Sequence, residues 1–368
     1  MELKNLSYYE RPEISHSDLS NFEWGGPNYF RRCKQENFSD KDTEAFSFGE
    51  QFHCFVLEPE KFDAQYAVED VKRVNGLTGE FLKNIVKLEK EPSIVLEANE
   101  IYKTAYLATG FKLSFENVLK SLEQGENIEY LNFLRENWDK IRVSKESYSK
   151  IQTMYENLMS HKKARKLILE EGTSSEDCEV FFEKEIYWES LVSINKKAEE
   201  LEMLACKSKL DILIIDKTNK KVTIADLKTT GKSLRQFKES YKDYKYYRQL
   251  AYYKDAAAFY LAFMGIKDVE KWKFQIYIIA VEKGLSNDVA VFEPAETDLI
   301  QGAKEYKSLQ KELMWHFKNN IWTPKSSNTT TGVEPITIFD TLNINDSTLP
   351  KEQNIRYEQN GENGREIL

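Results

Sequence analysis

The chain has 368 residues, of which 41% are apolar and 13% aromatic, and its formal net charge is −9. This length allows one large domain or two ordinary ones, and the composition is that of a folded protein rather than a disordered chain. The first residues lack the apolar run of a signal peptide, and no segment approaches the roughly 18–20 continuous apolar residues that span a bilayer. We therefore expect a cytoplasmic protein that does not bind a membrane.

The four cysteines are widely separated, at Cys33, Cys54, Cys178 and Cys206. No two of them form a C-x-x-C pair, which argues against a zinc ribbon, a disulfide framework or a locally held iron–sulfur cluster. The chain also lacks the glycine-rich loops G-x-x-x-x-G-K-[ST] and G-x-G-x-x-G that hold nucleotide phosphates. We expect free thiols and no nucleotide cofactor.

Residues 1–170 are predicted to form a mainly helical portion. Short helices open it, with Ser15 or Ser17 as an N-cap. The next helix ends at Pro59, and its buried face at helical spacing consists of Phe48, Phe52, Phe55 and Val56. His53 lies on this apolar face, where an imidazole is poorly tolerated without a partner. A hydrogen-bonded core histidine is the alternative to a functional one.

Residues 71–135 are predicted to be helical but irregular, because Gly76, Gly79 and Gly110 interrupt the pattern. Residues 145–170 form a further amphipathic helix.

The pattern changes after residue 172. The segments 178–189, 204–216 and 220–230 are rich in Val, Ile, Phe and Thr and predict successive strands, with Asn219 in the last turn. A helix follows over 234–265, then strands over 272–281 and 288–292 and a helix over 296–319. We predict an α/β fold in which a central mixed sheet is flanked by helices, with its core at 171–323. Residues 324–368 are polar and predict a flexible C-terminal tail.

Two carboxylates and a lysine stand at the ends of apolar strand segments. Asp211 opens the run ILII, and Asp226 closes the run VTIA on the next strand, so a turn at 217–220 would bring them together. Strand alternation points Lys228 to the same face as Asp226. Hydrolysis of a phosphodiester needs a divalent cation, which oxygen ligands hold, and a positioned water. A surface hairpin with scattered charges is the alternative, because Asp-x-Lys is common by chance.

A basic stretch follows the lysine. Residues 228–248 contain seven basic residues and two acids, which gives this stretch a net charge of +5 in a chain of −9. The basic residues after Lys228 are Lys232, Arg235, Lys238, Lys242, Lys245 and Arg248. Local positive charge interleaved with tyrosines suits a surface that contacts DNA phosphates and bases. Gln249 and Tyr253 lie on one face of the same helix. Core packing is the alternative for this tyrosine-rich run.

At these residues the sequence resembles the exonuclease VIII (RecE-type) branch of the PD-(D/E)XK nucleases, close to the nuclease domains of RecBCD and AddAB. The resemblance covers much of residues 13–322 and rests on several ordered motifs, which are ISHSDLSNF, FGEQFHCFVLEPEKF, KSKLDILI, IADLKTT, YRQLAYYKDA and FQIYIIAVEK. It implies the restriction-endonuclease-like core of that superfamily. Residues 71–135 match only weakly.

The resemblance also implies roles for individual residues. The positions matched to ligands of Mg²⁺ or Mn²⁺ are His53 (four residues after Gly49), Asp211, Asp226 and the backbone carbonyl of Leu227. Lys228 matches the lysine that positions or activates the attacking water. Gln249 and Tyr253 match a Q-x-x-x-Y pair that contacts DNA near the scissile phosphate.

The function implied is that of a 5′→3′ exonuclease on double-stranded DNA ends in phage-type recombination, within a bacterial or phage-infected cell. It would leave 3′ overhangs for a single-strand annealing partner, and a ring-shaped homo-oligomer is an option. Two alternatives stay open: an endonuclease or repair or defence nuclease of the same fold, and a catalytically silent DNA-binding or assembly protein. The tail could recruit the annealing partner or be a plain solvated terminus.

Overall fold

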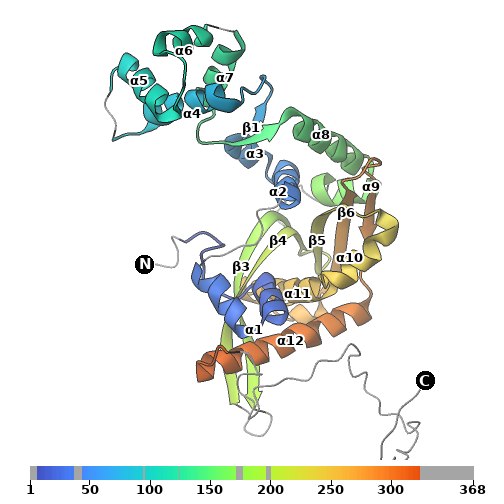
Figure 1. Cartoon of the computed structure of the whole chain (residues 1–368). Coiled ribbons are helices and arrows are strands. Elements are labelled where there is room, and N and C mark those ends of the chain that lie inside the picture. Colours follow the sequence, from blue (N-terminus) through green and yellow to red (C-terminus); the bar gives the residue numbers. More distant parts are fainter. Residues whose placement is uncertain are drawn as a thin grey trace, which may run out of the picture. The chain divides into compact units, whose positions relative to one another are not determined.

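The strands predicted after residue 177 form one five-stranded sheet in the computed structural model of the chain (Figure 1). The strands follow one another across the sheet in chain order, as β3 (Cys178–Asn195), β4 (Glu200–Asp216), β5 (Lys221–Thr230), β6 (Lys273–Glu282) and β7 (Val289–Phe292). Only β5 and β6 run parallel, and the other neighbours are antiparallel. The sheet is therefore mixed, as predicted.

The helices cover both faces of this sheet. The structure describes residues 6–36, 44–93, 96–123, 125–170, 177–195 and 200–323. Their longer helices are α1 (His16–Glu36), α2 (Glu44–Leu57), α4 (Gly76–Lys90), α5 (Ala98–Thr109), α6 (Phe115–Leu122), α7 (Gly125–Glu136), α8 (Lys145–Ser160), α11 (Tyr246–Phe263) and α12 (Glu296–Asn319). The short ones are α3 (Pro59–Gln65), α9 (Lys162–Arg165), the π-helical turn η2 (Lys166–Glu170), η3 (Leu234–Gln236), α10 (Phe237–Asp243) and η4 (Val269–Lys271).

Strand alternation divides the core into two layers. On β4, Leu213 and Ile215 face a cluster made with α1, α11 and α12, whereas Ile212 and Ile214 face a cluster made with α2 and α8. Successive side chains of a strand point to opposite faces, so a run of apolar residues can serve both layers. Residues at the strand ends consequently lie between α2 on one face and α11 on the other.

The first helix is tied to the sheet at its start. Ser15 Oγ accepts a hydrogen bond from the backbone N–H of Asp18, and the Asp18 carboxylate accepts from the N–H of Ser15, so Ser15 rather than Ser17 is the cap. Just before it, Ile14 pairs with Cys206 of β4. As predicted, this region consists of short helices, because α1 is two helical segments that meet at a kink at Gly26, whose backbone is non-helical with φ 76°, ahead of Pro27.

A separate apolar cluster lies among α4, α5, α6 and α7. It connects to the rest of the chain through β1 (Tyr66–Glu69) and β2 (Ile141–Ser144), which form a small parallel sheet that the sequence did not predict. Gly79, predicted as a breaker, lies inside α4, where a Cβ would overlap the carbonyl oxygen of Val74. The predicted break was wrong here because the missing side chain serves close packing.

Two long predicted helices are divided. The segment 145–170 changes direction at His161, where the ring Nδ1 caps the following α9. The segment 234–265 becomes η3, α10 and α11, with Lys245 in a left-handed conformation (φ 52°) between the last two. The described helices include none that is long and apolar enough to cross a bilayer. The predicted tail, 324–368, lies outside the described residues.

Candidate active site

The β4–β5 hairpin brings the two predicted acids together. Ile212 pairs with Ala225, so Asp211 and Asp226 occupy the next opposed positions. The backbone N–H of Leu227 donates to Asp211 Oδ2 at 2.7 Å. In the turn, the N–H of Asn219 donates to the Asp216 carboxylate, which fixes the register of the hairpin.

Lys228 lies beside Asp226 as strand alternation predicted. Its Nζ is 2.7 Å from Asp226 Oδ2. The Asp226 side chain is only 1% exposed, and its Oδ1 is buried with no hydrogen-bond partner among the described residues. An unpaired buried carboxylate oxygen is costly, so this atom calls for a cation or a water.

His53 reaches the same place from α2. Its Nδ1 lies 3.7 Å from Asp211 Oδ2. At Gly49, one turn earlier, a Cβ would stand 3.3 Å from Thr229 Oγ1, so glycine lets α2 approach β5 closely. Burial, and next the charge of Lys228, lower the pKa of His53 to about 4. The ring is therefore neutral at neutral pH and offers a nitrogen lone pair to a metal.

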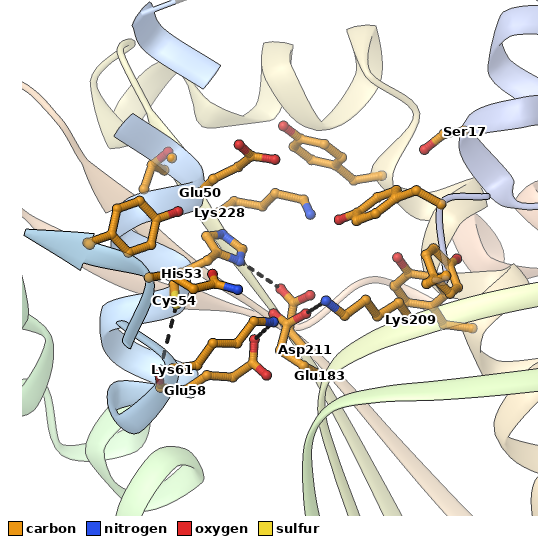
Figure 2. A pocket seen from close by; sticks show the side chains of 18 of the residues that line it. Ser17, Glu50, His53, Cys54, Glu58, Lys61, Glu183, Lys209, Asp211 and Lys228 are labelled. Atoms are coloured by element: carbon orange, nitrogen blue, oxygen red, sulfur yellow. Dashed lines mark hydrogen bonds and ion pairs between the residues drawn. The ribbon is translucent and has the colours of Figure 1, made fainter. Parts of the chain in front are cut away.

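Glu183 joins these residues, although the sequence analysis did not single it out. It lies on β3 opposite Asp211, in a left-handed conformation with φ 50°. Ligand atoms of His53, Glu183 and Asp211 lie within 4.8 Å of one another. Lys209 Nζ pairs with Glu183 Oε2 at 2.5 Å. Figure 2 shows the side chains of His53, Glu183 and Asp211 pointing toward one another. Regular strand alternation gives no signal for this side chain.

Burial dominates the electrostatics of the acids. It raises the pKa of Asp211 to about 6 against the opposing charge of Lys228, and Glu183 adds to the rise. It likewise raises the pKa of Asp226 to about 6, with Lys228 opposing and Asp211 adding. Burial alone would lower the pKa of Lys228, but Asp226 and then Asp211 outweigh it and raise that pKa.

These residues fit a hard divalent cation. Carboxylate oxygens are suitable ligands for Mg²⁺ or Mn²⁺, and a neutral imidazole nitrogen is a ligand for transition metals. The orphaned Asp226 Oδ1 and the close approach of His53, Glu183 and Asp211 support this assignment. Of the ligands proposed from the sequence, the structure brings His53 and Asp211 together, while the Asp226 carboxylate beside them faces Lys228. Leu227 is adjacent, and its backbone N–H donates to the Asp211 carboxylate.

A cavity of about 910 Å³ opens onto these side chains. Its lining is rich in tyrosines that are far apart in the sequence. They are Tyr8, Tyr9, Tyr66, Tyr244, Tyr246 and Tyr253. Lys228 Nζ lies 5.4 Å from the centre of the Tyr246 ring. The predicted site residue Tyr253 is thus at the cavity, and Gln249 Nε2 donates to its hydroxyl at 2.8 Å.

The basic residues after Lys228 have unequal surroundings. Arg235, Lys238 and Lys242 are exposed on η3 and α10. Lys232 pairs with Glu239 and Asp243, at 3.4 and 3.6 Å. Lys245 pairs with Glu23 at 2.5 Å. Exposed lysines on α10 therefore offer the most accessible positive charge in this stretch.

Arg248 does not fit the DNA-binding role predicted for it. Its side chain is 1% exposed. The guanidinium donates to Glu23 at 2.7 Å, to Ser20 Oγ at 3.0 Å and to His16 Nε2 at 3.2 Å. All three partners belong to α1, so Arg248 joins α11 to α1. The prediction was wrong because charge was counted along the sequence without knowledge of this buried partner helix.

Comparisons with known proteins place most of the chain in a family. A family model described as a PDDEXK-like domain of unknown function matches residues 15–331. Among solved structures, the chain is similar to a protein of Eubacterium rectale described as a "putative exonuclease", with 10% sequence identity and a TM-score of 0.45, over 92% of this chain and 96% of that one. A search of curated proteins finds no match.

Proposed function

Because this chain belongs to the family of PDDEXK-like domains, a nuclease superfamily, we propose that it is a metal-dependent nuclease that hydrolyses phosphodiester bonds in DNA. The observation that carries the proposal is the meeting of Asp211, Asp226 and Lys228 just beyond the last paired residues of β4 and β5, with His53 beside them. A surface hairpin with scattered charges would not bury these groups or leave Asp226 Oδ1 without a partner.

The proposed roles follow from position. His53, Asp211, Asp226 and the carbonyl of Leu227, joined by Glu183, would hold Mg²⁺ or Mn²⁺. The bound cation would offset the negative charge that develops on the phosphate during hydrolysis. Lys228 would orient the attacking water or a phosphate oxygen through its ammonium hydrogens. Gln249 would fix the Tyr253 hydroxyl against the substrate strand.

We further propose that the substrate is the end of double-stranded DNA, degraded 5′→3′ in phage-type recombination. The motif resemblance supports this finer reading. A single-strand annealing protein would receive the 3′ overhang, and a ring-shaped homo-oligomer would retain the DNA. Strand polarity can be read with linear duplexes labelled at either the 5′ or the 3′ end.

The primary test compares linear with covalently closed circular duplex DNA, in magnesium, manganese or EDTA. We expect metal-dependent loss of the linear DNA alone. A Lys228→Ala variant should lose at least about 100-fold in rate, since one positioned charged donor contributes on that order. Lys271→Ala, which removes an exposed lysine outside the cavity, should match the wild type.

The same assay separates the alternatives. Cleavage of the circle would favour an endonuclease or a repair or defence nuclease of this fold. Binding of DNA without hydrolysis in either metal would overturn the proposed activity and leave a DNA-binding or assembly protein. Equal loss in Lys228→Ala and Lys271→Ala would remove Lys228 from the reaction.

A further inference from the structure

Four aromatic rings form a continuous stack beside the cavity. The Phe292 and Phe237 ring centres are 5.0 Å apart with planes 6° from parallel. Phe237 and Tyr246 follow at 6.0 Å and 27°, and Tyr246 and Tyr244 at 5.7 Å and 28°. These separations lie within the range of favourable ring contacts. The stack fixes the orientation of its last ring.

Tyr244 ends this stack among the described residues. It is 64% exposed and lines the cavity together with Tyr246. It lies between α10 and α11, just before Lys245 with its left-handed backbone. A large aromatic ring held by stacking and open to solvent is a ready platform for another flat, aromatic group.

The cavity offers a polyanion little net attraction from its side chains alone. Its lining contains four lysines and four acids, which are Lys61, Lys209, Lys228 and Lys283 against Glu50, Glu58, Glu183 and Asp211. Their charges cancel, since +4 and −4 sum to zero. A strand must therefore be held here largely by the bound metal and by contacts to its bases. Stacking on tyrosine is the base contact that the lining provides.

The size and depth of the cavity favour an unpaired strand over a duplex. A volume of about 910 Å³ is in the range of pockets that hold one drug-sized molecule, which leaves room for a few nucleotides of one strand but not for a duplex. Asp211 lines the cavity and its side chain is only 12% exposed, so the scissile phosphate must enter the cavity rather than pass across its rim.

We propose that the site takes unpaired DNA, and that Tyr244 is the platform on which a base of the entering strand stacks, continuing the ring series from Phe292. This inference rests on the proposed nuclease function and specifies its substrate as unpaired nucleotides at a DNA end. Tyr244 determines specificity by holding the base, while the acids and Lys228 act on the phosphate.

The test measures binding without hydrolysis. Two DNA hairpins carry a fluorophore in the loop, and they differ only in that one ends blunt while the other has three unpaired nucleotides on each terminal strand. Anisotropy titrations with calcium, which oxygen ligands also bind, give Kd for the wild type, Tyr244→Ala and Tyr244→Phe. Phe263→Ala is the matched control, because Phe263 is 79% exposed on α11 and does not line the cavity.

The wild type should bind the splayed hairpin at least about fivefold more tightly than the blunt one, the factor given by the weakest base–aromatic stacking. This preference should disappear in Tyr244→Ala and persist in Tyr244→Phe and Phe263→Ala. Equal binding of both hairpins by the wild type, or a preference unchanged in Tyr244→Ala, would overturn the proposal. An equal loss in Tyr244→Phe would overturn it too, because stacking needs the ring and not the hydroxyl.

Failure of this inference is distinguishable from failure of the proposed function. If the Tyr244-dependent preference is found but no metal supports hydrolysis, the nuclease proposal fails and the stacking proposal stands. If DNA is hydrolysed but splayed ends are not preferred, the stacking proposal fails and the nuclease proposal stands.

Discussion

Glu183 reaches the site through an unusual backbone conformation. A positive φ is uncommon for a residue other than glycine, and it turns the side chain out of the regular alternation of β3. Such conformations cost about 1–3 kcal/mol and are held only where the surroundings fix them. Here the ion pair with Lys209 fixes the carboxylate next to Asp211. The strained backbone therefore places the Glu183 side chain at the proposed metal site, beside those of His53, Asp211 and Asp226.

Glu183→Gln keeps the shape of this side chain and removes its charge. We expect Mn²⁺ to bind about tenfold more weakly, as follows when a supporting group of a metal site is lost. Calorimetric titration of the protein without DNA measures this directly. Glu189→Gln, at an exposed position of the same strand, should change Kd by less than twofold. Equal affinities in the wild type and Glu183→Gln would exclude Glu183 from the ligands.

His16 predicts how stability depends on pH. Burial, then Arg248 and Lys228, lower its pKa to about 3, from about 6.5 in the unfolded chain. Between these values the unfolded state binds a proton that the folded state excludes, so the free energy of unfolding falls as pH falls below 6.5. The contribution is roughly 1.4 kcal/mol per pH unit.

Urea unfolding at pH 7 and pH 5 measures this contribution. His16→Gln can still accept the Arg248 hydrogen bond through its amide oxygen but does not titrate, so its loss of stability between the two pH values should be smaller by about 2 kcal/mol. If the variant and the wild type lost the same amount, His16 would not be the group responsible.

At the scale of elements, the hairpin β4–β5 shows what the sequence can predict. Apolar runs, a turn with Asn219 and the two-residue alternation of strands are local signals, and they placed Asp211 beside Asp226 and Lys228 on the same face as Asp226. The mixed sheet followed from the same segments. The contacts of the hairpin depend on neighbours within about twenty residues, whereas the parallel pairing of β5 with β6 that makes the sheet mixed joins residues 52 positions apart, such as Lys221 and Lys273.

Features that depend on distant partners were not predictable in this way. Arg248 is buried because α1, more than 200 residues earlier, supplies Glu23, Ser20 and His16. Glu183 depends on a single backbone angle. The pairing of β1 with β2 joins strands separated by more than seventy residues. No local pattern contains this information.

Helix α10 carries a prediction about DNA binding. Lys238 and Lys242 are exposed on this helix, which leads directly to Tyr244 at the cavity. If both contact phosphates, replacing both with alanine should weaken binding and reduce the slope of log K against log salt by about 1.4–1.8. Anisotropy titrations at several salt concentrations give the slope. Replacing Lys103 and Lys112, also exposed, controls for net charge, and an unchanged slope in Lys238→Ala/Lys242→Ala would place α10 away from the DNA.

At the scale of the whole described chain, α1 packs against α12 and Trp322, and we call this contact the closure of the fold. Phe30 of α1 stacks on Trp322, with ring centres 6.1 Å apart and planes 18° from parallel. Trp322 also packs edge-on against Phe317 at the end of α12. Glu23 of the same α1 holds Arg248 of α11. The helix that begins the described fold is thus joined both to the helix beside the active site and to the residues that end the fold.

Trp322→Ala tests this closure. The lost ring contacts should lower the free energy of unfolding by about 1–3 kcal/mol, as for other changes that remove packed side chains. Chemical denaturation gives the value. Trp24→Ala, on the same α1 but 79% exposed, should stay within about 0.5 kcal/mol of the wild type. A cost no greater for Trp322 than for Trp24 would mean that α1 does not depend on this contact.

The packing of α1 against α12 has a consequence for when the protein can fold during its synthesis. His53 is made early, Asp211 and Asp226 much later, and the last strand of the sheet and the helix that packs on α1 and α11 follow only at β7 and α12. Domains fold as the chain leaves the ribosome, and contacts between distant segments form only when both have emerged. A ribosome that has not yet released α12 therefore presents an unfinished centre. We expect the ability to cleave DNA to appear only after synthesis of the chain has passed that helix.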